Sequence, residues 1–264
     1  MKKICMLSII VFIIPAISFA DDPKAREIMQ KVEDRDDGDN MTSEMEMILI
    51  DKKKNKRIRK MQRYLKDKGK DTCSIMFFLH PADVKDTGFF TYDYDDPDKD
   101  DDQWLYLPAL RKTKRIASND KSGSFMGSDL NYSDMTSRDL EDYDFTLKKE
   151  MDVKGQKTWL IEAVPRSKDV IDETGYDKSL IFVRQDNYFV IRAVHWVHDG
   201  GYLKYLDVKK LEQIDGIWIN IETHITKKKG KKTVHKTIMK NNNVRFNQKL
   251  DYELFTVRRL EKGI

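Results

Sequence analysis

The sequence predicts a mainly β protein of the α+β class, in which one long antiparallel sheet carries a few short helices. Many segments alternate apolar and polar residues with the period of two that is typical of strands. Short turn signals such as Asp199-Gly200-Gly201 and Lys229-Gly230-Lys231 separate these segments. Because short connections make neighbouring strands antiparallel, we expect the strands from residue 145 onward to form a long meander.

The first twenty residues have the pattern of a cleavable secretory signal. Lys2 and Lys3 form its positive end, 7–14 its apolar core, and 18–20 a small-x-small cleavage site. The apolar core is too short to span a membrane. Cys5 precedes this core, so it cannot be the acylated cysteine of a lipoprotein. We therefore expect a soluble periplasmic protein.

Residues 21–264 suit a single large β domain, since sandwiches and barrels of this size fold as one unit. The net charge of +4 includes two signal lysines, so nothing favours a nucleic-acid partner. Cys73 is the only cysteine after the signal, which excludes an internal disulfide and indicates a small buried side chain. We expect a monomer without a cofactor.

The first mature element is an amphipathic helix over residues 24–35. Asp22 can cap it, and Pro23 is tolerated in its first turn. Its apolar side chains recur at i, i+3, i+4 and i+7, which places them on one face. They are Ala25, Ile28, Met29 and Val32. This face can pack on a sheet.

Strands follow the helix. Residues 43–50 alternate, with Met45, Met47 and Leu49 on one side. The nearly continuous apolar run over 73–79 predicts a strand buried on both faces. Further strands are expected over 57–65 and 88–94.

An aspartate-rich loop follows at Asp93–Asp102. Asp96, Asp98 and Asp100 resemble the start of a calcium loop, but Asp101 stands where a glycine is needed and Leu107 where a glutamate is needed. Both a calcium site and a solvated hairpin loop stay open, and the second is favoured.

The central stretch 103–129 organises the chain. The strand over 104–107 ends at Pro108, which lacks a donor N–H, and a basic return strand follows over 111–116. Two large apolar residues, Phe125 and Met126, then stand between glycines in a loop of small residues. Such a pair is unusual in a solvated loop, so we expect it to cover an apolar surface.

The remaining elements are a short Ser-capped helix over 133–143, a series of strands, and a last helix over 251–260. The strands are expected over 145–153, 157–164, 178–184, 188–198, 202–214, 217–227 and 232–240.

Catalytic and metal sites find little support. His195 and His198 are three apart on a predicted strand and therefore point to opposite faces. Glu222 and His224 share a face but lack an evident third ligand. No nucleophile elbow or phosphate loop is present, so we expect no enzyme. The lysine-rich turn at 227–232 favours solubility, with transient contact to an anionic membrane surface as the alternative.

Several motifs carry a family resemblance. The run WLYLPALRKTKRIA at 104–117, the run SFMGSD at 124–129 with 130–134 after it, and the segments 81–84 and 254–257 resemble the LolA-like outer membrane lipoprotein-sorting family of Gram-negative bacteria. The resemblance implies a strongly curved half-barrel, or incomplete β-barrel, whose concave side is covered by short helices over an acyl-binding cavity.

The resemblance also implies a function: a periplasmic carrier or chaperone for a lipid or for lipoprotein acyl chains, acting toward the outer membrane, with an inner-membrane RND-type transporter as partner. The expected cavity wall or lid consists of Met45, Met47, Leu49, Trp104, Tyr106, Phe125 and Met126. Arg111 and Arg115 are expected near the mouth, where they could meet a head group.

Two alternatives remain open from the residues. Strand aromatics and methionines could fill the concave side completely, which composition alone favours over a cavity. The same half-barrel could also serve as a non-carrying interaction module, an adaptor or envelope-stress sensor, with the charged loops as docking surfaces.

Overall fold

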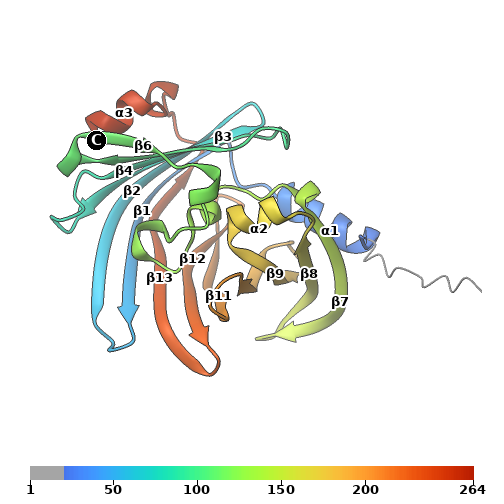
Figure 1. Cartoon of the computed structure of the whole chain (residues 1–264). Helices are drawn as coiled ribbons and strands as arrows, with labels where there is room; N and C mark the ends of the chain where they lie inside the picture. The colour runs from blue at the N-terminus through green and yellow to red at the C-terminus, as the bar shows by residue number, and fades with distance from the viewer. Residues whose placement is uncertain (1–20) are drawn as a thin grey trace, which may run out of the picture.

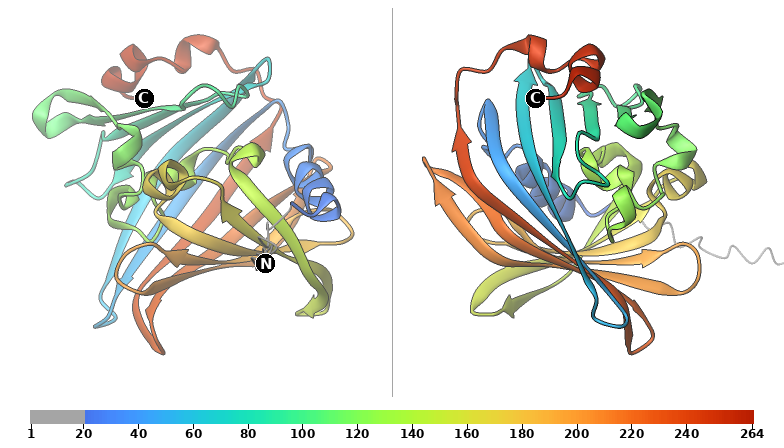
Figure 2. Two further views of the ribbon diagram at one scale, coloured as in Figure 1. Left: turned by 45° about the vertical axis from the view of Figure 1, so that its right-hand side comes forward. Right: turned by 90° about the vertical axis from the view of Figure 1, so that its left-hand side faces the viewer.

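A computed structural model describes residues 21–264; the predicted signal at 1–20 lies outside this range (Figure 1). Thirteen strands form one antiparallel sheet, in the order β6-β5-β4-β3-β2-β1-β13-β12-β11-β10-β9-β8-β7. The strands are β1 (Asn40–Asp51), β2 (Lys56–Lys68), β3 (Asp71–His80), β4 (Gly88–Asp93), β5 (Asp102–Leu107), β6 (Lys112–Arg115), β7 (Tyr143–Val153), β8 (Gln156–Pro165), β9 (Tyr176–Arg184), β10 (Val190–Val197), β11 (Tyr202–Ile214), β12 (Ile217–Lys229) and β13 (Lys232–Phe246). The sheet is strongly curved and open, as predicted (Figure 2).

The sheet consists of two meanders. β1 to β6 form the first and β7 to β13 the second, and β1 pairs with β13, for example Met47 with Met239. The second is the long meander predicted for the strands from residue 145 onward. The chain ends one meander at β6 and starts the next at the opposite edge, β7. Residues 116–142, here called the strap, must cross the open side of the sheet to connect them (Figures 1 and 2).

The helices are short. They are α1 (Pro23–Glu33), α2 (Lys168–Thr174) and α3 (Val257–Lys262), with the 3-10 helices η1 (Pro108–Leu110), η2 (Ser118–Asp120), η3 (Phe125–Gly127), η4 (Tyr132–Met135), η5 (Leu140–Asp142) and η6 (Tyr252–Leu254). As predicted, Asp22 caps α1 through its side chain, and Ala25, Ile28 and Met29 are buried. No helix among residues 21–264 combines the length and apolarity needed to cross a bilayer.

Two helix predictions were inaccurate. The helix expected over 133–143 is divided into η4 and η5, and its cap is Asn131 rather than Ser133. Thr136 between them is extended, because the strap's backbone and side chains bind the sheet instead of continuing a helix. The sequence reading also missed α2, which is seven residues long and capped by Ser167.

Strand β3 is buried on both faces, as its continuous apolar run predicted. Met76 and Phe78 face the strap on the concave side, whereas Ile75 and Phe77 pack with α3 on the convex side. Cys73, with 2% of its surface exposed, belongs to the convex-side cluster. The C-terminal segment therefore covers the outer face of the first meander, while the strap covers its inner face.

The aspartate-rich residues 93–102 form the β4–β5 hairpin loop. Asp100 accepts a hydrogen bond from Ser118, Asp101 accepts one from the backbone of Tyr94, and Asp102 pairs with Arg115. Within residues 21–264, no group of three or more His, Cys, Asp or Glu side chains is placed to hold a metal ion.

Candidate functional site

The strap fills part of the concave side of the first meander with its own side chains. The remaining, polar part of that side lines an open cleft of about 800 Å³, with Arg63, Ser74 and Thr91 among its residues. Phe125 has no exposed surface, and its ring centroid lies 5.0 Å from that of Phe89 and 6.3 Å from that of Phe78. Tyr132 packs edge-on against it at 5.6 Å. The sequence placed Phe125 in a cover over an apolar surface, and the structure shows it inserted into that surface.

The residues expected to form a cavity wall fall into two groups. Met45, Met47 and Leu49 are buried in the cluster around Phe125, and Met126 packs against it. Trp104 and Tyr106 lie on the other side of the sheet, where Trp104 stacks on Phe90 beside α3. The alternation within β5 is responsible, since Leu105 takes the concave side.

The two arginines expected near the mouth lie at the β5–β6 edge. Arg111 is exposed in a left-handed conformation (φ 46°) at the end of η1. Arg115 is paired with Asp102. Neither side chain lines the cavities described below.

Two mainly apolar cavities lie beneath α1 and the strap. One of about 210 Å³ lies between α1, the strap and β7–β9, and is lined by Met29, Val32, Tyr143 and Ala163 among others. The other, of about 270 Å³, lies between the strap and β9–β12, and is lined by residues such as Ala193, Leu206 and Ile225. Arg138 and Ile181 line both, so the two cavities meet there.

A buried polar network roofs these cavities. Asp134 of the strap binds Arg138 (3.0 Å) and accepts a hydrogen bond from the Tyr176 hydroxyl (2.8 Å). Lys204 of β11 donates to that hydroxyl (3.0 Å) and to Asn131 Oδ1 (2.7 Å). Burial opposes ionisation of Asp134, but the charges of Arg138 and Lys204 outweigh it and hold the pKa of Asp134 below its usual value.

Two basic groups of this network have lowered pKa values. Burial, with the charge of Lys227, lowers the pKa of Lys204 to about 8. Burial, with the charge of Arg138, lowers the pKa of His195 to about 3, so its ring is neutral at pH 7. His195 Nδ1 lies 2.7 Å from Ser179 Oγ. These polar contacts hold the strap to β9–β11, and Leu140 packs on the neighbouring apolar cluster of β7–β9.

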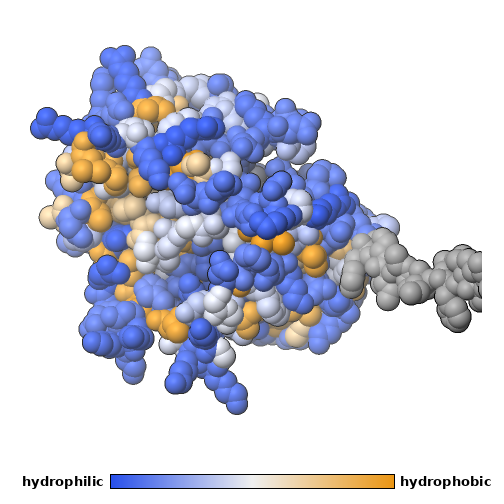
Figure 3. Space-filling view, in the orientation of Figure 1, coloured by the Kyte–Doolittle hydropathy of each residue, from blue (hydrophilic) through white to orange (hydrophobic). Residues whose placement is uncertain are grey.

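Further polar contacts fix the strap to other strands. Asp129 Oδ2 lies 2.8 Å from both His235 Nδ1 and Thr237 Oγ1 of β13. Asp93 of β4 accepts hydrogen bonds from the Ser137 backbone N (2.7 Å) and Oγ (2.8 Å). Burial, with the charge of Asp101, raises the pKa of Asp93 to about 7. The outer surface of this side is mostly hydrophilic, with apolar residues gathered toward β2–β6 (Figure 3).

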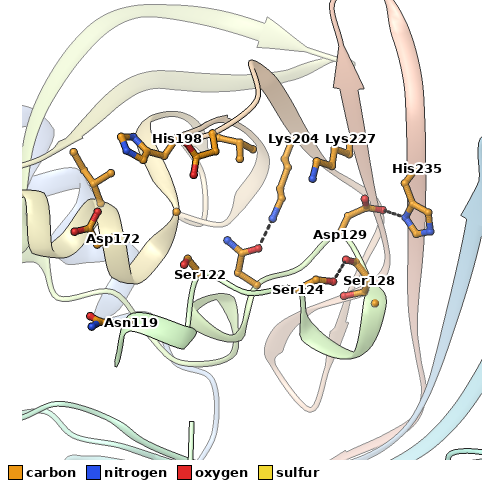
Figure 4. Close-up of a pocket in the computed structure, with 16 residues that line it drawn as sticks. Asn119, Ser122, Ser124, Ser128, Asp129, Asp172, His198, Lys204, Lys227 and His235 are labelled. Carbon is orange, nitrogen blue, oxygen red and sulfur yellow. Dashed lines mark hydrogen bonds and ion pairs between the residues drawn. The ribbon is translucent and has the colours of Figure 1, made fainter. Parts of the chain in front are cut away.

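A separate polar pocket of about 600 Å³ opens between the strap, α2 and β10–β13 (Figure 4). Lys204 and Lys227 enter it from the sheet, and Ser122 and Ser124 of the strap lie opposite. Asp129 and Lys204 line both this pocket and the 270 Å³ cavity.

The sequence reading missed the cavity-lining residues of the second meander. Ala163 and Ala193 are small residues at inward positions of strands, and the buried charges of Lys204 and Asp134 stand out only once their surroundings are known. The sequence did contain a signal for the cavities, because alanines among larger strand residues leave space in a core.

The comparisons with known proteins agree with this architecture. A family model described as an uncharacterized protein matches residues 70–262. A crystal structure from Vibrio parahaemolyticus, named as an outer membrane lipoprotein-sorting protein domain, is 30% identical with a TM-score of 0.81, covering 90% of this chain and 98% of that one. A DUF1329 family protein from Desulfovibrio piger is 28% identical with a TM-score of 0.82, covering 91% and 99%.

A LolA superfamily protein from Nitrosomonas europaea shares the fold at 17% identity, with a TM-score of 0.66 and coverage of 89% and 98%. No curated protein matches the chain. The matched family model spans most of the chain, and the resemblance seen in the motifs at 104–134 agrees with the structural neighbours. The chain belongs to the LolA-like outer membrane lipoprotein-sorting protein family.

Proposed function

We propose that this protein is a periplasmic carrier or chaperone that binds an acyl chain of a lipid or lipoprotein beneath α1 and the strap. The observation that carries the proposal is the pair of apolar cavities that meet at Arg138 and Ile181. The Vibrio relative, named for lipoprotein sorting, supports the same class of cargo. The site offers burial rather than covalent chemistry, so we propose a binding protein and not an enzyme.

The energetics favour such a site for hydrocarbon. Each methylene removed from water contributes about 0.8 kcal/mol, so a sixteen-carbon chain left in water costs on the order of 12 kcal/mol. A carrier must shelter this surface and then release it to a partner that buries it better. An open half-barrel with a covering strap can do both.

Binding requires the strap to move. Each cavity is smaller than the roughly 300–1,000 Å³ of ordinary ligand pockets, so a long chain needs both. Arg138 stands where they meet, and its contact to Asp134 is polar. Water can replace polar contacts when the strap lifts, whereas the apolar contacts of Phe125 hold its other part in place. We infer that the strap opens over the second meander and hinges near Phe125.

Two further parts of this proposal are the direction in which the cargo is transferred and the protein that supplies it. Delivery toward the outer membrane and receipt from an inner-membrane RND-type transporter stay predictions from the family resemblance. The anionic-surface contact suggested for the lysine-rich turn at 227–232 also stays a prediction.

Filling the cavities tests the proposal. Ala163→Phe and Ala193→Phe place a ring into existing space, and each should abolish saturable uptake of a fluorescent fatty acid. Ala109→Phe makes the same substitution at an exposed position of η1 and should leave uptake unchanged. Circular dichroism verifies that all three variants fold. Uptake that persists in both filled variants would contradict the site.

The native cargo is sought by lipid extraction and mass spectrometry of protein purified from the periplasm. Stoichiometric lipid supports the carrier. If wild-type protein neither contains lipid nor takes up fatty acid, and charge swaps in the loops abolish a pull-down, the chain is instead an interaction module.

A further inference from the structure

The polar pocket beside the strap contains a row of basic side chains on adjacent strands. In register, His195 of β10 lies opposite Lys204 of β11, Lys204 opposite Lys227 of β12, and Lys227 opposite His235 of β13. Like charges directly opposite one another destabilise a sheet. The Lys204–Lys227 pair therefore opposes folding unless something anionic lies between them.

Neither lysine has a carboxylate partner of its own among residues 21–264. Lys204 donates only to the neutral groups Asn131 Oδ1 and the Tyr176 hydroxyl. Lys227 Nζ lies over the Tyr202 ring, 4.5 Å from its centroid, and no carboxylate of the described chain lies within 4.0 Å of either Nζ. Asp134 and Asp129 attract the charge of Lys204 without contacting it, whereas Lys227 has no ion pair within the described chain and is the more available cation for a ligand.

The acidic residues of the pocket are engaged elsewhere. Asp129 is bound by His235 and Thr237, and Asp172 is bound by Lys168 at 2.5 Å. Asp199 is exposed at the turn after β10. The inner end of the pocket, where Lys204 and Lys227 enter opposite Ser122, is consequently its basic part (Figure 4).

The basic end adjoins the apolar space. Lys204 lines both the polar pocket and the 270 Å³ cavity, whose other walls include Ala193, Leu206 and Ile225. One elongated molecule can therefore place a charged end at the lysines and a hydrocarbon end in the cavity. Two ammonium groups and serine hydroxyls suit a phosphate, which has several acceptor oxygens and up to two charges.

We propose that the polar pocket binds the phosphate-bearing head group of an amphiphile whose chain occupies the adjacent cavity, with Lys204 and Lys227 as the two cations. This proposal rests on the carrier function above and specifies its cargo as anionic. It also replaces Arg111 and Arg115 as head-group contacts, since those lie at the β5–β6 edge.

Matched amphiphiles test it. Hexadecyl phosphate and hexadecanol have the same tail, and wild-type protein should bind the phosphate at least about tenfold more tightly. Lys227→Gln should remove most of this preference by weakening the binding of hexadecyl phosphate. Lys227→Arg should retain it. Lys231→Gln, at the exposed tip of the β12–β13 hairpin, removes the same charge as a control and should have no effect.

The outcomes separate the two proposals. Equal affinity for the two amphiphiles, or a preference that survives in Lys227→Gln, overturns the head-group site and leaves the carrier intact. Binding of neither amphiphile overturns the carrier. Inorganic phosphate should compete only weakly with hexadecyl phosphate; if it binds as tightly without a tail, the pocket is a site for free phosphate and the lipid assignment fails.

Discussion

The two meanders of the sheet meet the same strap in different ways. Over the first, the strap inserts Phe125 into a core of methionines and aromatics and fills the space around them, beside a polar cleft of about 800 Å³. Over the second, it presents Asn131, Asp134 and Arg138, which bind polar groups of the sheet and leave two cavities below them. The strap is therefore held by apolar packing around Phe125 and by polar contacts at 131–138.

The difference follows from the chemistry of the contacts. Withdrawing Phe125 would expose apolar surface to water, for which nothing compensates. Separating Asp134 from Tyr176 exchanges protein hydrogen bonds for hydrogen bonds to water, which costs far less. The part of the strap that we propose to open is thus the part with polar contacts, and it lies over the two apolar cavities.

The largest expected effect comes from Phe125→Ala. Truncating a fully buried aromatic in a filled core should lower the free energy of unfolding by about 3–5 kcal/mol. Urea unfolding measures the change. Leu110→Ala, where 62% of the side chain is exposed, should change it by less than about 0.5 kcal/mol. If the free energy of unfolding falls by less than about 1 kcal/mol in Phe125→Ala, the Phe125 side chain is not tightly packed against the first meander.

An intermediate effect is expected for Tyr176→Phe. The variant keeps the ring but removes the hydroxyl that contacts Asp134 and Lys204, so the free energy of unfolding should fall by about 1–3 kcal/mol. Hydrogen exchange should accelerate at residues 131–138 and stay unchanged around Phe125.

The matched control is Tyr94→Phe, which removes a hydroxyl bonded to Asp102 in the β4–β5 hairpin. It should leave exchange in the strap unaltered. Equal acceleration of hydrogen exchange at 131–138 and around Phe125 in Tyr176→Phe would show that the two parts of the strap do not differ.

The smallest effect concerns pH and Asp93, which joins the strap to the first meander at Ser137. Its pKa is raised to about 7 in the fold, chiefly by burial, so the folded state holds a proton that the unfolded state releases above about pH 4. This contribution to stability is complete below the unfolded pKa and is lost as pH rises through 7.

Asp93→Asn should therefore match wild type near pH 4 and exceed it by roughly 1–2 kcal/mol at pH 8, since Asp93 lines the polar cleft of about 800 Å³ and water there moderates the burial cost. Urea unfolding at the two pH values measures this. Asp98→Asn, in the exposed part of the same hairpin loop, should show no such pH dependence. An Asp93→Asn variant that is less stable than wild type at pH 8 would contradict the expectation.

Local patterns determined much of the fold. The alternation of Met45, Met47 and Leu49 assigned one side of β1 to the interior, the run over 73–79 predicted burial on both faces, and Asp22 with Pro23 marked the start of α1. Each of these features depends on neighbours within a few residues, because side-chain period and capping are properties of the local backbone.

Only the tertiary structure decided how these elements combine. The pairing of β1 with β13 joins residues nearly two hundred positions apart, and alternation contains no information about which distant strands pair. For the same reason, the sequence did not show that Trp104 and Tyr106 lie on the convex side, or that the helix expected over 133–143 is divided. The insertion of Phe125 between the strands is a tertiary contact, and the Lys204–Lys227 pair arises from strand register. Both depend on contacts between distant residues that form only in the folded chain.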